Sequence, residues 1–180
     1  MNLHYTLKTL FITLFALSLF GCNAINEELP TYEETSLVWE GDVAPDFTIT
    51  LLRGEEVTLS SLRGEVVLLT LFTHTCPDCK MLFDDLMVSK ADIDSLGVKM
   101  LAISRGGTAE EIESYIESNG YDFLVGADPT ADIFYTLYAT AYVPRCYLIN
   151  KQGIIDTATI EYDESYIPRF IQRMKELVKE

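Results

Sequence analysis

The chain has 180 residues, a length typical of one globular domain. Its 28 acidic residues outnumber 13 basic residues and give a formal net charge of −15 at pH 7. Because an acidic surface repels phosphate groups, we expect no nucleic-acid partner and no attachment to anionic lipids by charge alone.

The segment 1–21 has the pattern of an export signal. Lys8 precedes an apolar run of 11 residues at 10–20, shorter than the roughly 20 apolar residues of a transmembrane helix. The end of the run, with Gly21-Cys22, resembles the lipobox of bacterial lipoproteins, which implies a lipid on Cys22. An ordinary cleaved signal and an uncleaved anchor are the alternatives. All three predict a cell-envelope protein with its domain in the periplasm or outside the cytoplasmic membrane.

The residues after the signal are polar and acidic. Segment 22–41 contains a single proline, which favours an extended spacer between a lipid anchor and a folded domain. The domain itself is expected at 42–180.

Short apolar runs alternate with segments of helical spacing along this domain. Strands are expected at 47–52, 56–59, 66–72, 98–104, 123–125, 145–150 and 154–160. Helices are expected at 60–63, 77–90, 108–117, 130–138 and 164–178. This order predicts an α/β fold with a central mixed sheet flanked by helices and an N-terminal β-hairpin.

Local signals support several of these helices. Thr108 and Glu111 have the spacing of a capping box. Pro77 and Pro168 are each tolerated in a first helical turn. The inner stripe of the helix at 77–90 is predicted to consist of Met81, Leu82, Leu86 and Met87.

The motif Cys76-Pro77-Asp78-Cys79 lies between a predicted strand and a predicted helix. The helix N-terminus favours a thiolate at Cys76, and Cys79 is one turn away, so the pair can close into a disulfide and reopen. A structural zinc site is the alternative, but it needs two more ligands at compatible spacing. The other cysteines and the histidines, which form no second pair, are Cys22, Cys146, His4 and His74. We therefore expect redox chemistry without a metal or an organic cofactor.

Further segments accompany this pair at 41–47, 57–64 and 147–153, together with Val143-Pro144 before the last hairpin. Together they resemble the thioredoxin superfamily, in particular the extracytoplasmic thiol–disulfide oxidoreductases of the TlpA and ResA type, which are related to the AhpC/TSA redoxins. The resemblance covers the chain from about residue 41 to its end. It implies a thioredoxin-like enzyme that exchanges disulfides with exported proteins, such as apocytochromes, and draws on a membrane electron donor.

The resemblance also implies a role for each motif residue. Cys76 would be the attacking thiol and Cys79 the resolving thiol. Pro144 is expected to be cis, because a cis proline exposes the backbone of the preceding Val143 to an extended substrate. An ordinary trans proline at the start of a strand is the alternative. Reduction of protein disulfides is the favoured direction, although the residues alone do not determine it.

Four positions depart from the family pattern. Thr75 replaces a common tryptophan, Thr70 a frequent buried acid, Leu82 a frequent glutamate and Asp84 the usual helix-kinking proline. Proton transfer to the resolving thiol therefore lacks its expected acids, and His74 and Asp78 are the nearest titratable replacements. The charge of Asp78 would oppose a thiolate, and His74 has the alternative of a solvent-facing loop residue.

A peroxiredoxin-like thiol peroxidase is a second interpretation. Thr73 lies three residues before Cys76, the spacing at which peroxiredoxins bind peroxide beside a reactive thiolate. Cys76 would then form a sulfenic acid that condenses with Cys79, and Arg145 would stabilise the thiolate.

A third interpretation is a non-catalytic, lipid-anchored binding module with a structural Cys76–Cys79 bridge. A loop of so few residues has little chain entropy to lose, so such a bridge stabilises weakly and fits a reactive bond better. Cys146 alternates with Leu148 on a predicted inner strand, and we expect it to be a buried, inert thiol.

Overall fold

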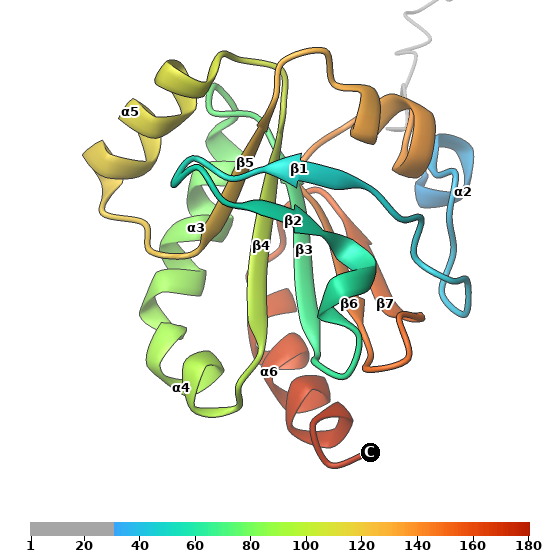
Figure 1. The fold of residues 1–180 in the computed structure, drawn as a ribbon. Coiled ribbons are helices and arrows are strands. Elements are labelled where there is room, and N and C mark those ends of the chain that lie inside the picture. The colour runs from blue at the N-terminus through green and yellow to red at the C-terminus, as the bar shows by residue number, and fades with distance from the viewer. Residues whose placement is uncertain (1–30) are drawn as a thin grey trace, which may run out of the picture. The chain divides into compact units, whose positions relative to one another are not determined.

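The computed structural model describes residues 31–180. A five-stranded sheet with the order β5-β4-β3-β6-β7 forms its centre, and a separate hairpin, β1–β2, crosses in front of it (Figure 1). The strands are β1 (Thr48–Thr50), β2 (Glu56–Thr58), β3 (Val67–Phe72), β4 (Lys99–Arg105), β5 (Leu124–Asp128), β6 (Arg145–Ile149) and β7 (Ile155–Ile160). The helices are α2 (Tyr32–Thr35), η1 (Leu59–Leu62), α3 (Pro77–Val88), α4 (Lys90–Ser95), α5 (Ala109–Asn119), η2 (Ile133–Tyr138) and α6 (Tyr166–Leu177).

The sheet is mixed, as predicted. Strands β3, β4 and β5 run parallel, whereas β6 is antiparallel to both β3 and β7. Parallel neighbours need crossover connections, and the helices supply them. The central position of β3 places its C-terminal end, and the cysteine motif that follows, at the middle of one edge of the sheet.

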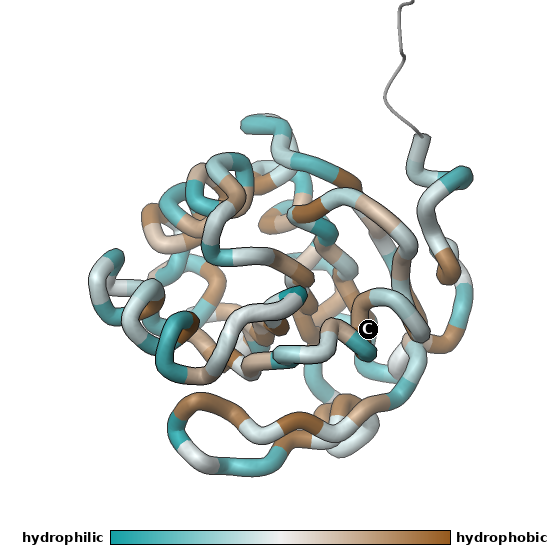
Figure 2. Tube along the Cα trace, turned by 90° about the horizontal axis from the view of Figure 1, so that it is seen from above, coloured by the Kyte–Doolittle hydropathy of each residue, from teal (hydrophilic) through white to brown (hydrophobic). Residues whose placement is uncertain are grey.

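Both faces of the sheet are covered, which explains why β3 is a continuous apolar run. All six residues of β3 are buried. One face packs against α3, α4, α5 and α6, and the other against the hairpin, η2 and the segment 31–44. Hydrophobic and hydrophilic stretches alternate along the coiled parts of the tube in Figure 2. The buried residues of α5 and α6 recur at helical spacing, so each of these helices presents an apolar face to the core.

Several elements differ from the sequence-based expectation. The helix expected at 77–90 stops at Val88, and a separate helix, α4, which the prediction omitted, begins at Lys90. Strand β5 extends to Asp128. The helix expected at 130–138 is the wider π-type helix η2. The capping box of Thr108 and Glu111 is present at the start of α5. No helix in the described part of the chain is long and apolar enough to cross a membrane.

The segment 31–44, here called the N-terminal strap, packs on the domain, whereas a spacer was expected up to residue 41. Thr35, Ser36, Val38 and Ala44 are buried, whereas the acidic residues of the strap stay exposed. Residues 31–41 are thus included in the same compact unit as the rest of the described chain. The proposed signal and Cys22 lie outside the described residues.

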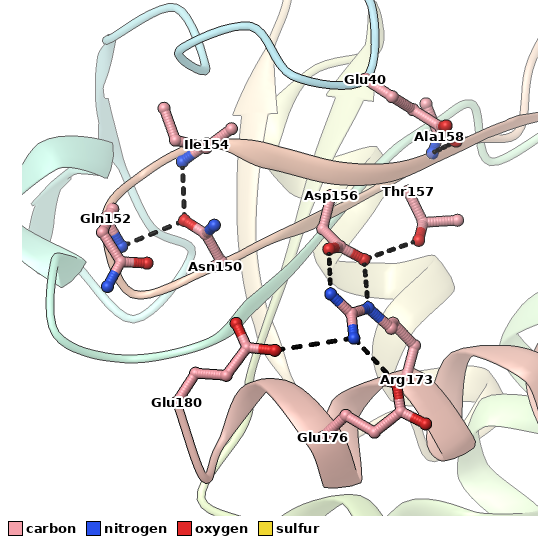
Figure 3. A network of polar contacts seen from close by, with 10 residues as sticks. All are labelled: Glu40, Asn150, Gln152, Ile154, Asp156, Thr157, Ala158, Arg173, Glu176 and Glu180. Carbon is pink, nitrogen blue, oxygen red and sulfur yellow. Dashed lines mark hydrogen bonds and ion pairs between the residues drawn. The ribbon is translucent and has the colours of Figure 1, made fainter.

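Backbone hydrogen bonds fix the strap along two segments of the domain. Its first part pairs with the end of η2, and its last part pairs with the start of β7. The Glu40 carboxylate also accepts the Ala158 N–H at 3.0 Å, a contact drawn in Figure 3. The backbone bonds run from Leu37 N to Tyr138 O (3.0 Å), Gly41 N to Ile155 O (2.8 Å), Ala44 N to Gly153 O (2.9 Å) and Ile155 N to Asp42 O (2.9 Å).

The inner face of α3 is rotated relative to the predicted stripe. Met81 is 46% exposed, whereas Phe83, which the prediction omitted, is 0% exposed. The Phe83 ring meets the rings of Phe72 at 4.8 Å, Phe123 at 4.9 Å and Tyr121 at 5.3 Å. Positions 81, 82, 83, 86 and 87 are all apolar, so sequence spacing alone left the direction of the stripe open.

Replacing Phe83 should therefore destabilise the fold far more than replacing Met81. We expect Phe83→Ala to lower the free energy of unfolding by about 3–5 kcal/mol, because it leaves a cavity among three aromatic rings. Met81→Ala, the matched control on the same helix, should cost about 0.5 kcal/mol or less. Urea denaturation followed by circular dichroism measures both. Equal costs for the two variants would contradict the observed orientation of α3.

Candidate active site

The cysteine pair lies where β3 ends and α3 begins. Pro77 is the first helical residue, where its missing N–H and fixed φ are both tolerated. Cys76 is the N-cap, with an extended backbone at φ −89° and ψ 120°, and its Sγ accepts the backbone N–H of Cys79 at 3.4 Å. The local sequence thus holds Cys76 where free N–H groups and the helix dipole favour an anion.

The two thiols differ strongly in burial. Cys79 is 0% exposed, whereas Cys76 is only partly buried. Burial raises the pKa of the Cys79 thiol well above its ordinary value, the hydrogen bond with Cys76 adds to the rise, and the backbone of Thr73 acts in the opposite direction. The pair therefore combines an accessible thiol with a buried thiol that is protonated at neutral pH.

A second segment brings a backbone acceptor to the accessible thiol. Residues 139–144, here called the cis-proline loop, precede β6, and the Val143–Pro144 peptide bond is cis, as expected. The Val143 carbonyl oxygen accepts the Cys76 thiol at 3.6 Å, although the two residues are 67 positions apart. The fold thus assembles Cys76, Cys79, Val143 and Pro144 into one site.

The residues before Cys76 line the same region. The Thr73 carbonyl accepts the Cys76 N–H at 3.1 Å. The His74 Nδ1 atom is buried, and within residues 31–180 it has no hydrogen-bond partner. The ring of His74 lies against Gly107, where an added Cβ would come within 3.2 Å of it. Asp78 is half-buried in the first turn of α3.

The two positions where the resemblance led us to expect acids hold no titratable group. Thr70 and Leu82 are buried, at 2% and 1% exposure. Sequence reasoning overlooked Tyr115, whose hydroxyl is buried and lacks a hydrogen-bond partner within the described chain. Burial raises the pKa of Tyr115, and negative charge on Cys79 would raise it further. In the sequence, Tyr115 follows Ile112 by three positions, which indicated that Tyr115 lies on the inner face of α5. This spacing did not indicate that Tyr115 lies near the cysteine pair.

Arg145 does not lie beside the thiols, which corrects the role expected for it in the peroxidase interpretation. Successive side chains of β6 point to opposite faces of the sheet, and Cys146 packs in the same cluster as Cys79. Arg145 is 0% exposed, and all its hydrogen-bond acceptors belong to residues 35–36 and 141–142. Because side chains alternate along β6, the Arg145 side chain lies on the face of the sheet opposite to Cys146 and Cys79.

Cys146 is the third thiol in the described chain. It is 1% exposed, and burial raises the pKa of its thiol to about 11. Its Sγ lies 3.8 Å from the Thr70 hydroxyl oxygen. Its burial agrees with the expectation from the sequence, and its inertness stays a prediction. Residues 31–180 contain no group of three or more His, Cys, Asp or Glu side chains that could hold a metal ion.

Comparison with known proteins shows the family of this chain. The AhpC/TSA family matches residues 41–158. The thiol–disulfide oxidoreductase ResA of Bacillus subtilis is 27% identical over 137 residues, which cover 76% of each chain. ResA of Geobacillus kaustophilus is 30% identical over 122 residues, 68% of this chain and 70% of its own.

A solved structure extends the likeness to three dimensions. The solution structure of a putative protein disulfide isomerase from Bacteroides thetaiotaomicron has a TM-score of 0.75 and 35% identity, and covers 81% of this chain and 94% of its own. The mixed sheet and its flanking helices are therefore a thioredoxin-like fold, as the sequence predicted. The chain belongs to the AhpC/TSA family and is a thiol–disulfide oxidoreductase of the ResA type.

Proposed function

We propose that this protein reduces disulfides of exported proteins through a Cys76–Cys79 dithiol. The observation that carries the proposal is the asymmetry of the pair. Cys76 is accessible and receives a backbone N–H bond on its Sγ, whereas Cys79 is buried one turn behind it. An accessible attacking thiol and a protected resolving thiol are what sequential disulfide exchange needs.

The reaction proceeds in two exchanges. The Cys76 thiolate attacks one sulfur of the substrate disulfide, whose S–S bond breaks, and the departing thiolate takes up a proton. Cys79 then loses its proton and attacks the Cys76 sulfur, which forms the Cys76–Cys79 disulfide and releases the second substrate thiol. Two electrons pass to the substrate, so a dithiol donor must return two electrons before the next cycle.

The proposal includes a location. A signal at 1–21 and a lipid on Cys22 would hold the domain at the outer side of the cytoplasmic membrane, where disulfides form and persist. A membrane-bound dithiol protein would then be the electron donor. The support for this part comes from the sequence at 1–22.

The reduction potential of the pair tests the proposed direction. We expect a value nearer to about −270 mV, typical of thioredoxin, than to about −120 mV, typical of a strong oxidant, because Cys79 is buried as a neutral thiol and the reduced pair gains little extra stabilisation. Equilibration in dithiothreitol redox buffers, with alkylation and mass analysis of Cys76 and Cys79, gives the value. A potential near the oxidising limit would reverse the proposed direction.

The same preparation separates the reductase from the peroxidase. Peroxide consumption should be slow with or without a thiol regenerant, since Arg145 is directed away from the thiols. Rapid turnover of hydrogen peroxide with a regenerating thiol would replace the proposed function by the peroxidase. The Cys79→Ser variant serves as the control in both assays, because it cannot close the disulfide.

A further inference from the structure

Arg145 is a fully buried cation without an acidic partner in the described chain. It is 0% exposed, and none of the ion pairs among residues 31–180 includes it. A buried charge is costly unless hydrogen bonds satisfy it. Here every nitrogen of the guanidinium group has at least one acceptor, and the ring of Tyr32 lies 5.4 Å from its central carbon. The burial of Arg145 therefore depends on these hydrogen bonds, and losing any of them leaves part of a buried charge unsatisfied.

The acceptors of Arg145 come from two separate segments. In the N-terminal strap, Nη1 donates to the Ser36 hydroxyl at 2.6 Å, and Nη2 donates to the Thr35 carbonyl at 3.1 Å and to the Thr35 hydroxyl. In the cis-proline loop, Nε and Nη2 donate to the Ala141 carbonyl at 3.1 and 2.9 Å, and Nε reaches the Tyr142 carbonyl at 3.4 Å. One guanidinium group therefore joins the strap to the loop.

The loop has a backbone geometry that needs such support. Tyr142 has φ +60°, a region that costs free energy for a residue with a side chain. The next carbonyl, that of Val143, faces the Cys76 thiol at 3.6 Å. A shift of the backbone at Tyr142 would move this carbonyl directly.

The strap also contacts the loop directly, through backbone groups that do not involve Arg145. The Thr140 N–H donates to the Thr35 carbonyl at 2.8 Å, and Ser36 forms an isolated β-bridge with Ala139. The strap thus contacts the first two residues of the loop directly, and Arg145 extends the link to Ala141 and Tyr142. The loop lies between the strap on one side and Cys76 on the other.

We propose that Arg145 is a positioning residue, which holds the cis-proline loop against the N-terminal strap and so sets the backbone that a protein substrate meets beside Cys76. This inference rests on the proposed function, because it assigns the loop to protein disulfides. It also makes the strap a part of the active site's support. Small disulfides, which have no extended backbone to bind, depend on Cys76 alone.

The test compares two disulfide substrates in the full chain. Arg145→Lys keeps the charge but presents one nitrogen in place of a planar fork. We expect its rate of insulin reduction to fall about tenfold, the effect of losing a hydrogen bond to a charged group. Its rate with Ellman's reagent should change by less than about twofold, because that step needs only the thiol. Hydrogen exchange at the Thr140 amide should become faster.

Matched variants keep the test decisive. Arg173→Lys is the control, since Arg173 binds Asp156 at 2.7 Å on α6 and β7, in the network of Figure 3, and should affect neither substrate. If Arg145→Lys does not fold, Thr35→Val and Ser36→Ala, which each remove one strap acceptor, should show the same selective loss to a smaller degree.

The outcomes separate the two claims. Equal slowing with both substrates, or an unchanged insulin rate in Arg145→Lys or in both strap variants, would overturn the positioning role. If the wild-type protein reduces Ellman's reagent but not insulin, the proposed function is wrong. In that case, hydrogen exchange at the Thr140 amide still tests whether Arg145 holds the loop. Faster exchange in Arg145→Lys supports this link, and unchanged exchange rejects it.

Discussion

Cys76→Ser should abolish the reduction of insulin, with a loss of about 10³-fold or more, the scale expected when a nucleophile is removed. The hydroxyl of serine cannot open a disulfide under these conditions, and Cys79 is too buried to take over the attack. Cys79→Ser should behave differently. It retains the attacking thiol, so it should accumulate a mixed disulfide between Cys76 and the substrate, which non-reducing electrophoresis and mass spectrometry detect.

Cys146→Ser is the matched control for both variants. Its thiol is buried in the same core cluster as Cys79, yet we expect turnover within about twofold of the wild-type value, as for a residue outside the reacting groups. Changed turnover in a folded Cys146→Ser protein would make it a third redox residue. Substantial activity of Cys76→Ser would shift the attack to another thiol.

The resolving step should accelerate about tenfold for each pH unit between pH 6 and pH 9, because only the thiolate of Cys79 attacks the mixed disulfide. Burial is the largest cause that raises the pKa of Cys79, and it persists when Cys76 is bound to a substrate. Throughout this range the pH lies below that pKa, so the small thiolate fraction grows in proportion to hydroxide. No plateau should appear before pH 9.

Ellman's reagent resolves the two steps in a single turnover. One equivalent, added to reduced protein with Cys22→Ser, should release a first thionitrobenzoate when Cys76 attacks and a second when Cys79 resolves. The rate of the second phase gives the pH dependence, and the added Cys79→Ser substitution should remove that phase. A second phase that does not change between pH 6 and pH 9 would mean that a neighbouring group takes the proton from Cys79, with His74, whose Nδ1 is buried without a hydrogen-bond partner in the described chain, as the candidate.

Much of the fold follows from local sequence signals. Strand β3 is a short apolar run that ends at the cysteine motif, and α5 begins at its capping box, so both were predictable. Helix α3 was predictable in position but not in rotation. Its apolar residues extend over more of the helix surface than one face, so their spacing does not define the buried side. The aromatic rings packed around Phe83 determine which side faces the core.

The support of the active site could not be predicted, because it depends on contacts between distant segments. The strap has the acidic composition of a spacer, and its four buried residues stand among exposed acidic residues. From the sequence, Arg145 was expected to lie near the Cys76 thiolate. Its hydrogen-bond partners in the strap are instead 109 and 110 positions away along the chain. Sequence patterns record the burial of apolar residues, but they do not record which hydroxyls and carbonyls will surround a buried guanidinium group.

The strap and the hairpin also cover the two outermost strands of the sheet. The outermost strands β7 and β5 would otherwise expose backbone groups that can pair with another chain. Residues 41–44 bind the start of β7, and the hairpin residues Leu51 and Leu52 bind β5 at Gly126 and Val125. Gly126 permits this approach, because an added Cβ would lie 2.7 Å from the Ile49 side chain. The strap and the hairpin thus occupy backbone groups on both edge strands, which leaves fewer of them free to pair with another chain and aggregate.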